Sequence, residues 1–275
     1  MFENIAVGIT LYNPPETVWS HISFFTNLKL RVWIVDNSAT EQKNSFPGVE
    51  FYKHNANSGG LAKALNIYCE KAAELNLEWL LTLDQDSIFE SEKDLLNLLS
   101  HTQKSNSDVA IIAPSVIPFK KINTDFFAIT SGTLLRMQAQ KECGYYLEYF
   151  FIDALDTEYC LRLLSHGWKI KIVDDSLLNH KLGAMTEKYV PFYNKYIHIQ
   201  EYSPERIYYV FRNQTITINH YKNKFPDQCK IYRKSLFFHT IKILLYEKNK
   251  FAKLKMALRG FLDARKKIGG TEILK

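Results

Sequence analysis

Short apolar runs alternate with amphipathic segments along the first part of the chain. The apolar runs are rich in β-branched and aromatic residues, which is typical of buried strands. Strands are expected at residues 5–11, 30–35, 49–52, 79–83 and 109–113. Helical patterns lie between them, at residues 16–25, 61–75 and 92–103. This alternation predicts an α/β fold with a mainly parallel sheet that is covered by helices on both faces.

The pattern changes toward the C-terminus, where helices follow one another. Before that, residues 126–136 predict a strand, a turn and a strand, residues 169–173 predict another strand, and a helix is expected between them. Ser203 suits the N-cap of a later helix, because a proline follows it at the first helical position. Residues 230–268 predict two basic amphipathic helices with a break near Asn249. We therefore expect a main domain over residues 1–225 and a helical C-terminal region over 226–275.

Composition adds an uneven distribution of charge. The chain has 275 residues, of which 46% are hydrophobic, so it can bury a substantial core. Its net charge is +6, but residues 226–275 contain 13 Lys and Arg against 4 Asp and Glu. The basic character therefore belongs to the C-terminal helices. Their apolar positions, among them Leu236 and Phe237, could pack on the main domain or lie on an anionic membrane surface.

The cysteines and the N-terminus favour a cytoplasmic protein. Cys69, Cys143, Cys160 and Cys229 lack CxxC spacing, so neither a disulfide framework nor a zinc site is expected. The first residues do not resemble a cleaved signal, and no uncharged run is long enough to span a bilayer.

Two carboxylates end the apolar run at residues 79–83. Asp84 and Asp86 are one residue apart, so on an extended segment both side chains point the same way and can bind one cation or polar ligand. Ligands bind at the carboxyl ends of strands in open α/β sheets. The alternative is an acidic loop that closes a strand, with Ser87 and Glu90 capping the next helix.

Other polar residues also follow predicted strands. Asp36 ends the second strand, and a loop from Asn57 to Gly60 precedes a helix, an arrangement that can attract phosphate although it is neither a P-loop nor GxGxxG. Asp153 and Asp156 begin a later helix, where acidic residues often act only as caps. A histidine near a strand end, such as His180, is often only structural.

Read together, eight segments resemble the inverting nucleotide-sugar glycosyltransferases of family two, which have a GT-A fold, and within them the bacterial rhamnosyltransferases. The segments are VGITLYNP (7–14), IVDNS (34–38), NSGGLAKALN (57–66), LDQDS (83–87), SGTLL (131–135), FFIDALDTEYCLR (150–162), NHKLG (179–183) and YYVFRN (208–213). They occur in the family's order. Residues 1–225 would then be the GT-A domain.

The resemblance implies a role for each candidate residue. The donor nucleotide would contact Thr10, Tyr12, Asn13, Asp36, Asn57, Gly60, Lys63, Asp84 and Gln85. Lys63 would lie near the diphosphate as a point charge. Asp86 and His180 would bind Mn²⁺ or Mg²⁺, which neutralises the departing nucleoside diphosphate.

The general base is left open between two acids. Asp156 is favoured by its spacing to Arg162, and it would deprotonate the acceptor hydroxyl. The commoner Glu-Asp pair of the family is absent here, because Leu155 precedes Asp156, and Asp153 lies three residues earlier. Arg212 could contact phosphate or the acceptor, or could form a structural pair with an acid.

The resemblance predicts a metal-dependent enzyme that transfers L-rhamnose from dTDP-rhamnose to a cell-surface polysaccharide intermediate carried on a polyprenyl diphosphate. It would act in the cytoplasm, at the inner face of the cell membrane. A non-catalytic carbohydrate-binding or scaffold subunit that keeps the transferase shell is the alternative. The basic tail lacks a nucleic-acid-binding module, so no nucleic-acid partner is expected. The sequence excludes neither a monomer nor a homodimer.

Overall fold

The computed structural model describes residues 2–41, 46–118, 122–180, 185–190 and 195–266, with the backbone alone for 185–190 and 195–200. The chain forms two compact units. The first comprises Met1–Phe151 with Leu155–His180, and the second comprises Ile152–Ala154 with Lys181–Lys275.

The first unit is built on an eight-stranded sheet with the order β3-β2-β1-β4-β7-β6-β8-β5. Its strands are β1 (Ile5–Leu11), β2 (Arg31–Asp36), β3 (Val49–His54), β4 (Trp79–Asp84), β5 (Ser87–Phe89), β6 (Val109–Ile117), β7 (Thr133–Arg136) and β8 (Lys169–His180). Strands β3, β2, β1 and β4 are parallel to one another, as are β6 and β8. Strand β7 is antiparallel to both its neighbours, and β5 is antiparallel to β8. The sheet is therefore mixed.

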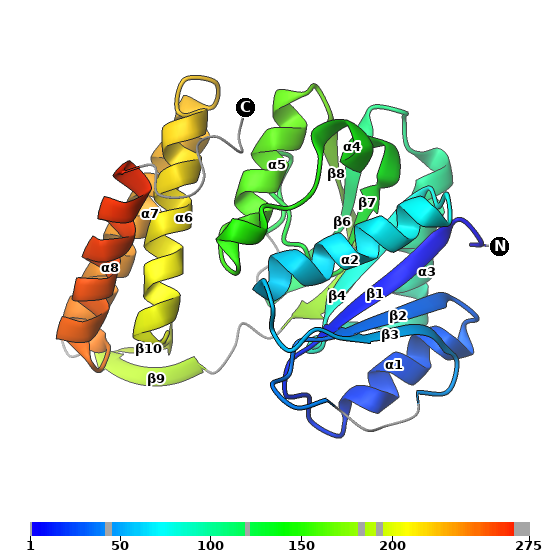
Figure 1. Ribbon diagram of the computed structural model, residues 1–275, viewed down its shortest axis with the longest axis horizontal. Helices are drawn as coiled ribbons and strands as arrows, with labels where there is room; N and C mark the ends of the chain where they lie inside the picture. The colour runs from blue at the N-terminus through cyan, green and yellow to red at the C-terminus, as the bar shows by residue number, and fades with distance from the viewer. Residues whose placement is uncertain (1, 42–45, 119–121, 181–184, 191–194, 267–275) are drawn as a thin grey trace. The chain divides into compact units, whose positions relative to one another are not determined.

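Helices cover both faces of this sheet, as the alternating pattern predicted (Figure 1). They are α1 (Val18–Asn27), α2 (Gly60–Glu74), α3 (Glu92–Lys104), α4 (Met137–Cys143) and α5 (Leu155–Ser165), with a short 3₁₀ helix η1 (Glu148–Phe150). One core joins the odd-numbered residues of β1 to the apolar stripes of α1 and α3. The other face of β1 meets α2, where a Cβ on Gly8 would lie 2.8 Å from the Tyr68 ring. Only glycine allows this close approach.

Several sequence expectations about strands need correction. Strand β6 does not end at Pro114 but continues to Ile117, because the pairing with β8 shifts register after Pro114. A bulge of this kind tolerates a residue without an N–H. Residues 126–132 do not form the expected first strand, and only Thr133–Arg136 is extended. Strand β8 runs seven residues past the predicted end, to His180, and β5 was not predicted.

The second unit is mainly helical. It contains a hairpin, β9 (Met185–Val190) with β10 (Lys195–Gln200), and the helices α6 (Pro204–Tyr221), α7 (Pro226–Tyr246) and α8 (Lys250–Arg265). Ser203 caps α6 as expected, because its Oγ accepts a hydrogen bond from the Arg206 N–H. The break between α7 and α8 is at Asn249, which is left-handed. Among the described residues, no helix is long and apolar enough to cross a membrane.

A buried ion cluster ties the helices of this unit together. Lys253 is 2% exposed, and its Nζ lies 2.7 Å from Glu247 and 3.0 Å from Glu201. Because α6 packs against both α7 and α8, the expected division of the chain after residue 225 separates helices that share one small core. The division after residue 225, between the part that carries the site and a C-terminal tail, stays a prediction.

Candidate active site

Three parallel strands bring polar residues to one edge of the sheet. In the register of β1 with its neighbours, Thr10 is opposite Asp84 of β4, and Leu11 is opposite Asp36 of β2. All three strands run in the same direction, so their carboxyl ends meet at this edge. The structure therefore brings Thr10, Asp36 and Asp84 to the same edge of the sheet, and their contact with a nucleotide stays a prediction.

Asp36 is held in a defined orientation inside this edge. Its side chain is fully buried, and it accepts hydrogen bonds from the Ser38 N–H (2.8 Å) and the Tyr52 hydroxyl (3.2 Å). Ser38 in turn accepts a bond from the backbone of Asn13 at 2.7 Å. A fixed carboxylate beside backbone groups can recognise a base or ribose hydroxyl by hydrogen bonds.

Gln85 links the ends of β1 and β4. Its side-chain oxygen accepts from the Tyr12 N–H at 2.8 Å, and its amide nitrogen donates to the Tyr12 carbonyl at 3.0 Å. The Tyr12 ring itself is 54% exposed. An exposed aromatic on a fixed backbone offers a stacking surface at this edge.

Asp84, Asp86 and His180 form a cluster that could hold a metal ion. Each offers one ligand atom, and these atoms all lie within 4.8 Å of one another. The His180 Nδ1 is 3.7 Å from an Asp86 oxygen. The cluster forms because Ser87 of β5 pairs with His180 of β8 in an antiparallel register. Two carboxylates and one imidazole are a donor set that suits a divalent cation.

A chain of hydrogen bonds connects the backbone of Asp84 to the ring of His180. The Asp84 N–H donates to the Ser131 Oγ (2.9 Å), Ser131 donates to the Ser87 Oγ (2.6 Å), and Ser87 lies 2.6 Å from the His180 Nδ1. Both serines are buried. When Nδ1 carries the proton, it donates to Ser87 and leaves the Nε2 lone pair for a cation.

Burial lowers the pKa of His180, although the neighbouring Asp86 carboxylate opposes the shift. A neutral imidazole is the form that binds metals. The alternative role of Ser87 as a helix cap is wrong, because Ser91 caps α3 by accepting from the Asp94 N–H.

The loop before α2 is less open to phosphate than its glycines suggested. Asn57, Gly59 and Gly60 all have positive φ. A Cβ on Gly60 would lie 2.4 Å from the Phe151 carbonyl oxygen, which also accepts a weak hydrogen bond from the Ala62 N–H at 3.4 Å. A backbone oxygen thus already lies at the start of this helix, where an anion would otherwise bind.

Lys63, in the first turn of α2, has an ionic partner that the sequence did not indicate. Its Nζ is 3.0 Å from Glu148 of η1. The hydrogen bond from Lys63 to Glu148 raises the pKa of Lys63. Burial alone would raise the pKa of Glu148, but hydrogen bonds from Asn66 and Lys63 outweigh it and lower that pKa. Both groups are therefore charged at neutral pH.

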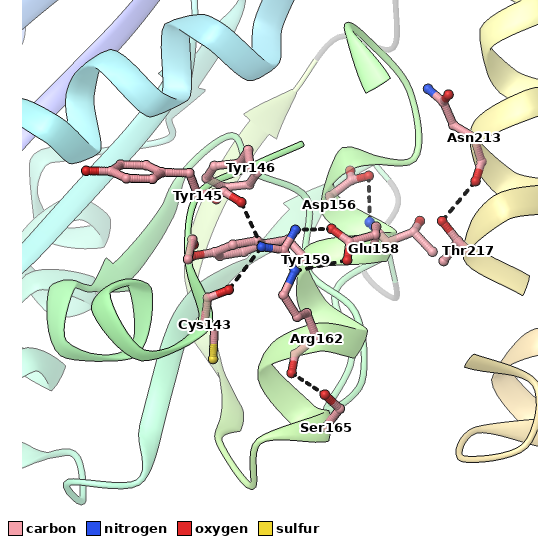
Figure 2. A network of polar contacts seen from close by, with 12 residues as sticks. Cys143, Tyr145, Tyr146, Asp156, Glu158, Tyr159, Arg162, Ser165, Asn213 and Thr217 are labelled. Carbon is pink, nitrogen blue, oxygen red and sulfur yellow. Dashed lines mark hydrogen bonds and ion pairs between the residues drawn. The ribbon is translucent and has the colours of Figure 1, made fainter. Parts of the chain in front are cut away.

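Asp156 lies in the first turn of α5, a helix fixed by an ion pair (Figure 2). Arg162 pairs with the buried Glu158 one turn earlier and donates to the carbonyls of Cys143 (3.1 Å) and Tyr145 (2.7 Å). Tyr146 stacks on Tyr159 at the same place, with the ring centroids 4.1 Å apart. The start of α5 is therefore rigidly attached to the segment after α4.

Asp153 has a different environment, inside the second unit. Arg206 holds its carboxylate through three hydrogen bonds of 3.0 to 3.3 Å. Asn213 donates to the carbonyls of Ile152 (2.8 Å) and Asp153 (3.0 Å). Asp153 and Ala154 both have positive φ, a conformation that surrounding contacts must maintain.

Arg212 is a buried residue of the same unit. Its guanidinium lies over the rings of Tyr208 and Tyr209, and its Nε donates to the Asn213 side chain at 2.9 Å. These contacts orient the amide of Asn213. Neither the predicted pair with an acid nor the predicted contact with phosphate or acceptor is tested by these contacts, and both stay predictions.

A family model and a known protein match parts of this chain. Residues 7–127, which contain most of β1, all of β2 to β6 and both carboxylates of the cluster, match the model of glycosyl transferase family 2. The chain is a glycosyltransferase that resembles family 2 over these residues. The transferase is also 28% identical over 240 residues to dTDP-rhamnosyl transferase RfbF of Shigella flexneri, an alignment that spans 77% of each chain.

The fold of the transferase is shared with a solved structure, that of residues 1–349 of TarS from S. aureus. The TM-score is 0.60 at 15% identity, and the match covers 94% of this chain and 80% of that one. The α/β fold of the GT-A type expected from the sequence is confirmed, as is the resemblance to family two.

The transferase contains further residues at its site that sequence reasoning missed. Ser87 and Ser131 support the cluster, Glu148 pairs with Lys63, and Glu158 anchors α5. The only signals were Ser87 and Ser131 inside the motifs LDQDS and SGTLL and Glu158 inside DTEYCLR. Glu148 had none, because its partner is 85 positions away.

Proposed function

We propose that this glycosyltransferase transfers L-rhamnose from dTDP-rhamnose to a hydroxyl group of a cell-surface polysaccharide intermediate, with inversion at the anomeric carbon. The observation that carries the proposal is the cluster of Asp84, Asp86 and His180 beside the buried Asp36. The 28% identity to dTDP-rhamnosyl transferase RfbF supports the choice of dTDP-rhamnose as the donor. The choice of rhamnose rests on that likeness, and the nucleotide site rests on the geometry.

The donor nucleotide would bind along the carboxyl edge of β2, β1 and β4. Asp36 would accept a hydrogen bond from the pyrimidine base or the ribose, and Tyr12 would stack on the base. Asn13, whose N–H donates to Ser38, and Gln85, whose side-chain oxygen accepts from the Tyr12 N–H, would shape this end of the site. Lys63 would lie near the diphosphate and contribute a positive charge.

Asp86 and His180 would hold Mn²⁺ or Mg²⁺, with Asp84 close enough to be a third ligand or to contact the ribose. When bound, the ion neutralises the charge that develops on the departing diphosphate. Ser87 and Ser131 keep the imidazole oriented for this role. Carboxylate and imidazole ligands together accept Mn²⁺ as well as Mg²⁺.

Asp156 would be the general base, removing the proton of the acceptor hydroxyl as its oxygen attacks the anomeric carbon. Asp153 is less suited, because Arg206 donates a hydrogen bond to each of its carboxylate oxygens. Asp153 thus already has a bidentate cationic partner, whereas Asp156 lies in the first turn of α5.

The acceptor would be carried on a polyprenyl diphosphate at the inner face of the cell membrane, and α7 and α8 would contact that surface. Their exposed apolar residues are Ile231, Phe237, Phe238, Leu244 and Leu245 on α7, and Phe251, Leu258 and Leu262 on α8. Their exposed basic residues are Lys230, Arg233, Lys234, Lys250, Lys255, Arg259 and Arg265. Of the acids, Asp227 is exposed at the start of α7, Glu247 is buried and Asp263 is paired with Arg259. Exposed apolar and basic side chains together suit an anionic lipid surface.

Transfer to a simple acceptor tests the catalytic proposal. A panel of nucleotide sugars should show turnover with dTDP-rhamnose, loss of turnover with a chelator and recovery with Mn²⁺ or Mg²⁺. Asp86→Asn should remove the metal response. Turnover that survives the chelator would refute the role of the ion, and binding of a glycan without turnover of any donor would favour the scaffold alternative.

Vesicle sedimentation tests the membrane proposal separately. Phe238 and Phe251 are 64% and 92% exposed, so Phe238→Glu with Phe251→Glu should keep the fold and reduce binding to anionic vesicles. Leu75→Glu, at an exposed position on the other unit, is the matched control. Equal binding of both variants would refute this role for α7 and α8.

A further inference from the structure

The first turn of α2 and the helix η1 meet around one carboxylate. Glu148 accepts from the Lys63 Nζ at 3.0 Å and from the Asn66 amide at 3.1 Å. Asn66 is buried, and it also exchanges two hydrogen bonds with the backbone of Tyr146, at 2.9 and 2.8 Å. Glu148 is therefore held by a buried amide on one side and by Lys63 on the other.

The two bonds differ in how easily they can be exchanged. Asn66 is 2% exposed, so its bonds are part of the interior. The Lys63 and Glu148 side chains are 32% and 45% exposed, so their ion pair lies at the surface. A surface pair contributes little net free energy, and another anion can replace one partner.

Lys63 is also the group beside the glycine loop that can bind an anion. At the start of α2, the Ala62 N–H donates to the Phe151 carbonyl oxygen at 3.4 Å, so that oxygen lies beside the loop. An incoming diphosphate would therefore depend on the Lys63 ammonium here, and a phosphate oxygen and a carboxylate oxygen compete for an ammonium group through the same charge-assisted hydrogen bond.

We propose that Glu148 is an internal counter-ion of Lys63, which the diphosphate of the donor displaces on binding and which pairs with Lys63 again when the nucleoside diphosphate leaves. This inference rests on the proposed function, since it takes the ligand to be a nucleoside diphosphate. No covalent bond is made or broken in the exchange. Its effect is to weaken binding of donor and product alike, which favours product release.

Calorimetric binding of dTDP in the presence of Mn²⁺ tests the exchange. Glu148→Gln keeps an acceptor for Asn66 but removes the charge that competes for Lys63. We expect it to bind dTDP about two- to fivefold more tightly than the natural chain, the range that a surface ion pair provides. The gain should disappear when Lys63→Met is added, because the exchange needs the ammonium group.

Glu50→Gln is the matched control. It removes the same charge from a surface pair with Arg31, at the amino ends of β2 and β3, and should leave the affinity unchanged. Equal or weaker binding by Glu148→Gln would overturn the inference, as would a gain that persists with Lys63→Met. If one of these outcomes is found and the natural chain still binds dTDP, the inference fails but the proposed function stands. If it binds no nucleotide or nucleotide sugar, the proposed function fails, and the inference fails with it.

Discussion

Ser87→Ala tests whether the serine pair orients His180 for a cation. Ser87 lies 2.6 Å from both the Ser131 Oγ and the His180 Nδ1. Alanine leaves Nδ1 without this partner, so the proton is no longer fixed on that nitrogen. Loss of such a supporting bond typically weakens metal binding about 10- to 100-fold, or roughly 1.4 to 2.7 kcal/mol.

Binding of Mn²⁺, followed by electron paramagnetic resonance with dTDP present, measures this loss directly. Ser165→Ala is the control, since its Oγ donates to the Arg162 carbonyl and lies 3.3 Å from the His166 Nδ1, both at the end of α5. The Ser87 variant should also lose about 1 to 3 kcal/mol of stability, because the buried Ser131 hydroxyl loses its acceptor. Unchanged Mn²⁺ affinity in a folded Ser87→Ala protein would refute the orienting role.

Three further outcomes are expected. Asp156→Asn should abolish transfer while dTDP affinity stays within about twofold in calorimetry, because the base acts on the acceptor; a collapse of nucleotide binding would mean that the residue is misassigned. Burial lowers the pKa of His239 from 6.5 to about 4, so the folded state binds fewer protons than the unfolded state. Urea unfolding should therefore show stability falling by roughly 2 to 3 kcal/mol between pH 7 and pH 4.5, and His239→Gln should remove that part of the slope. Gly8→Ala should cost about 1 to 3 kcal/mol in the same assay, because its Cβ would lie 2.8 Å from the Tyr68 ring; an unchanged midpoint would show that the ring can move.

The sequence predicted the elements that depend on local pattern. Strand β1 and the carboxylates that follow β4 lie as expected, since an apolar run that ends in acids is visible without any partner. The Ser203 cap and the break at Asn249 are equally local signals.

Pairings between distant residues could not be read in this way. Strand β5 is three residues long, too short to show a period, yet it brings His180 to Asp86. The continuation of β6 past Pro114 depends on a register shift against β8. The contact of Glu148 with Lys63 depends on where η1 packs, and no spacing in the sequence specifies it.

The short strand β5 has a consequence for how the enzyme matures. Ser87 and His180 are 93 positions apart, and their pairing lies at the last strand of the sheet order. Contacts of such long sequence separation form late, because the intervening chain must first be ordered. The proposed affinity for Mn²⁺ should thus emerge only when β5 has paired with β8. Binding of the ion would then report completed folding in stopped-flow refolding experiments.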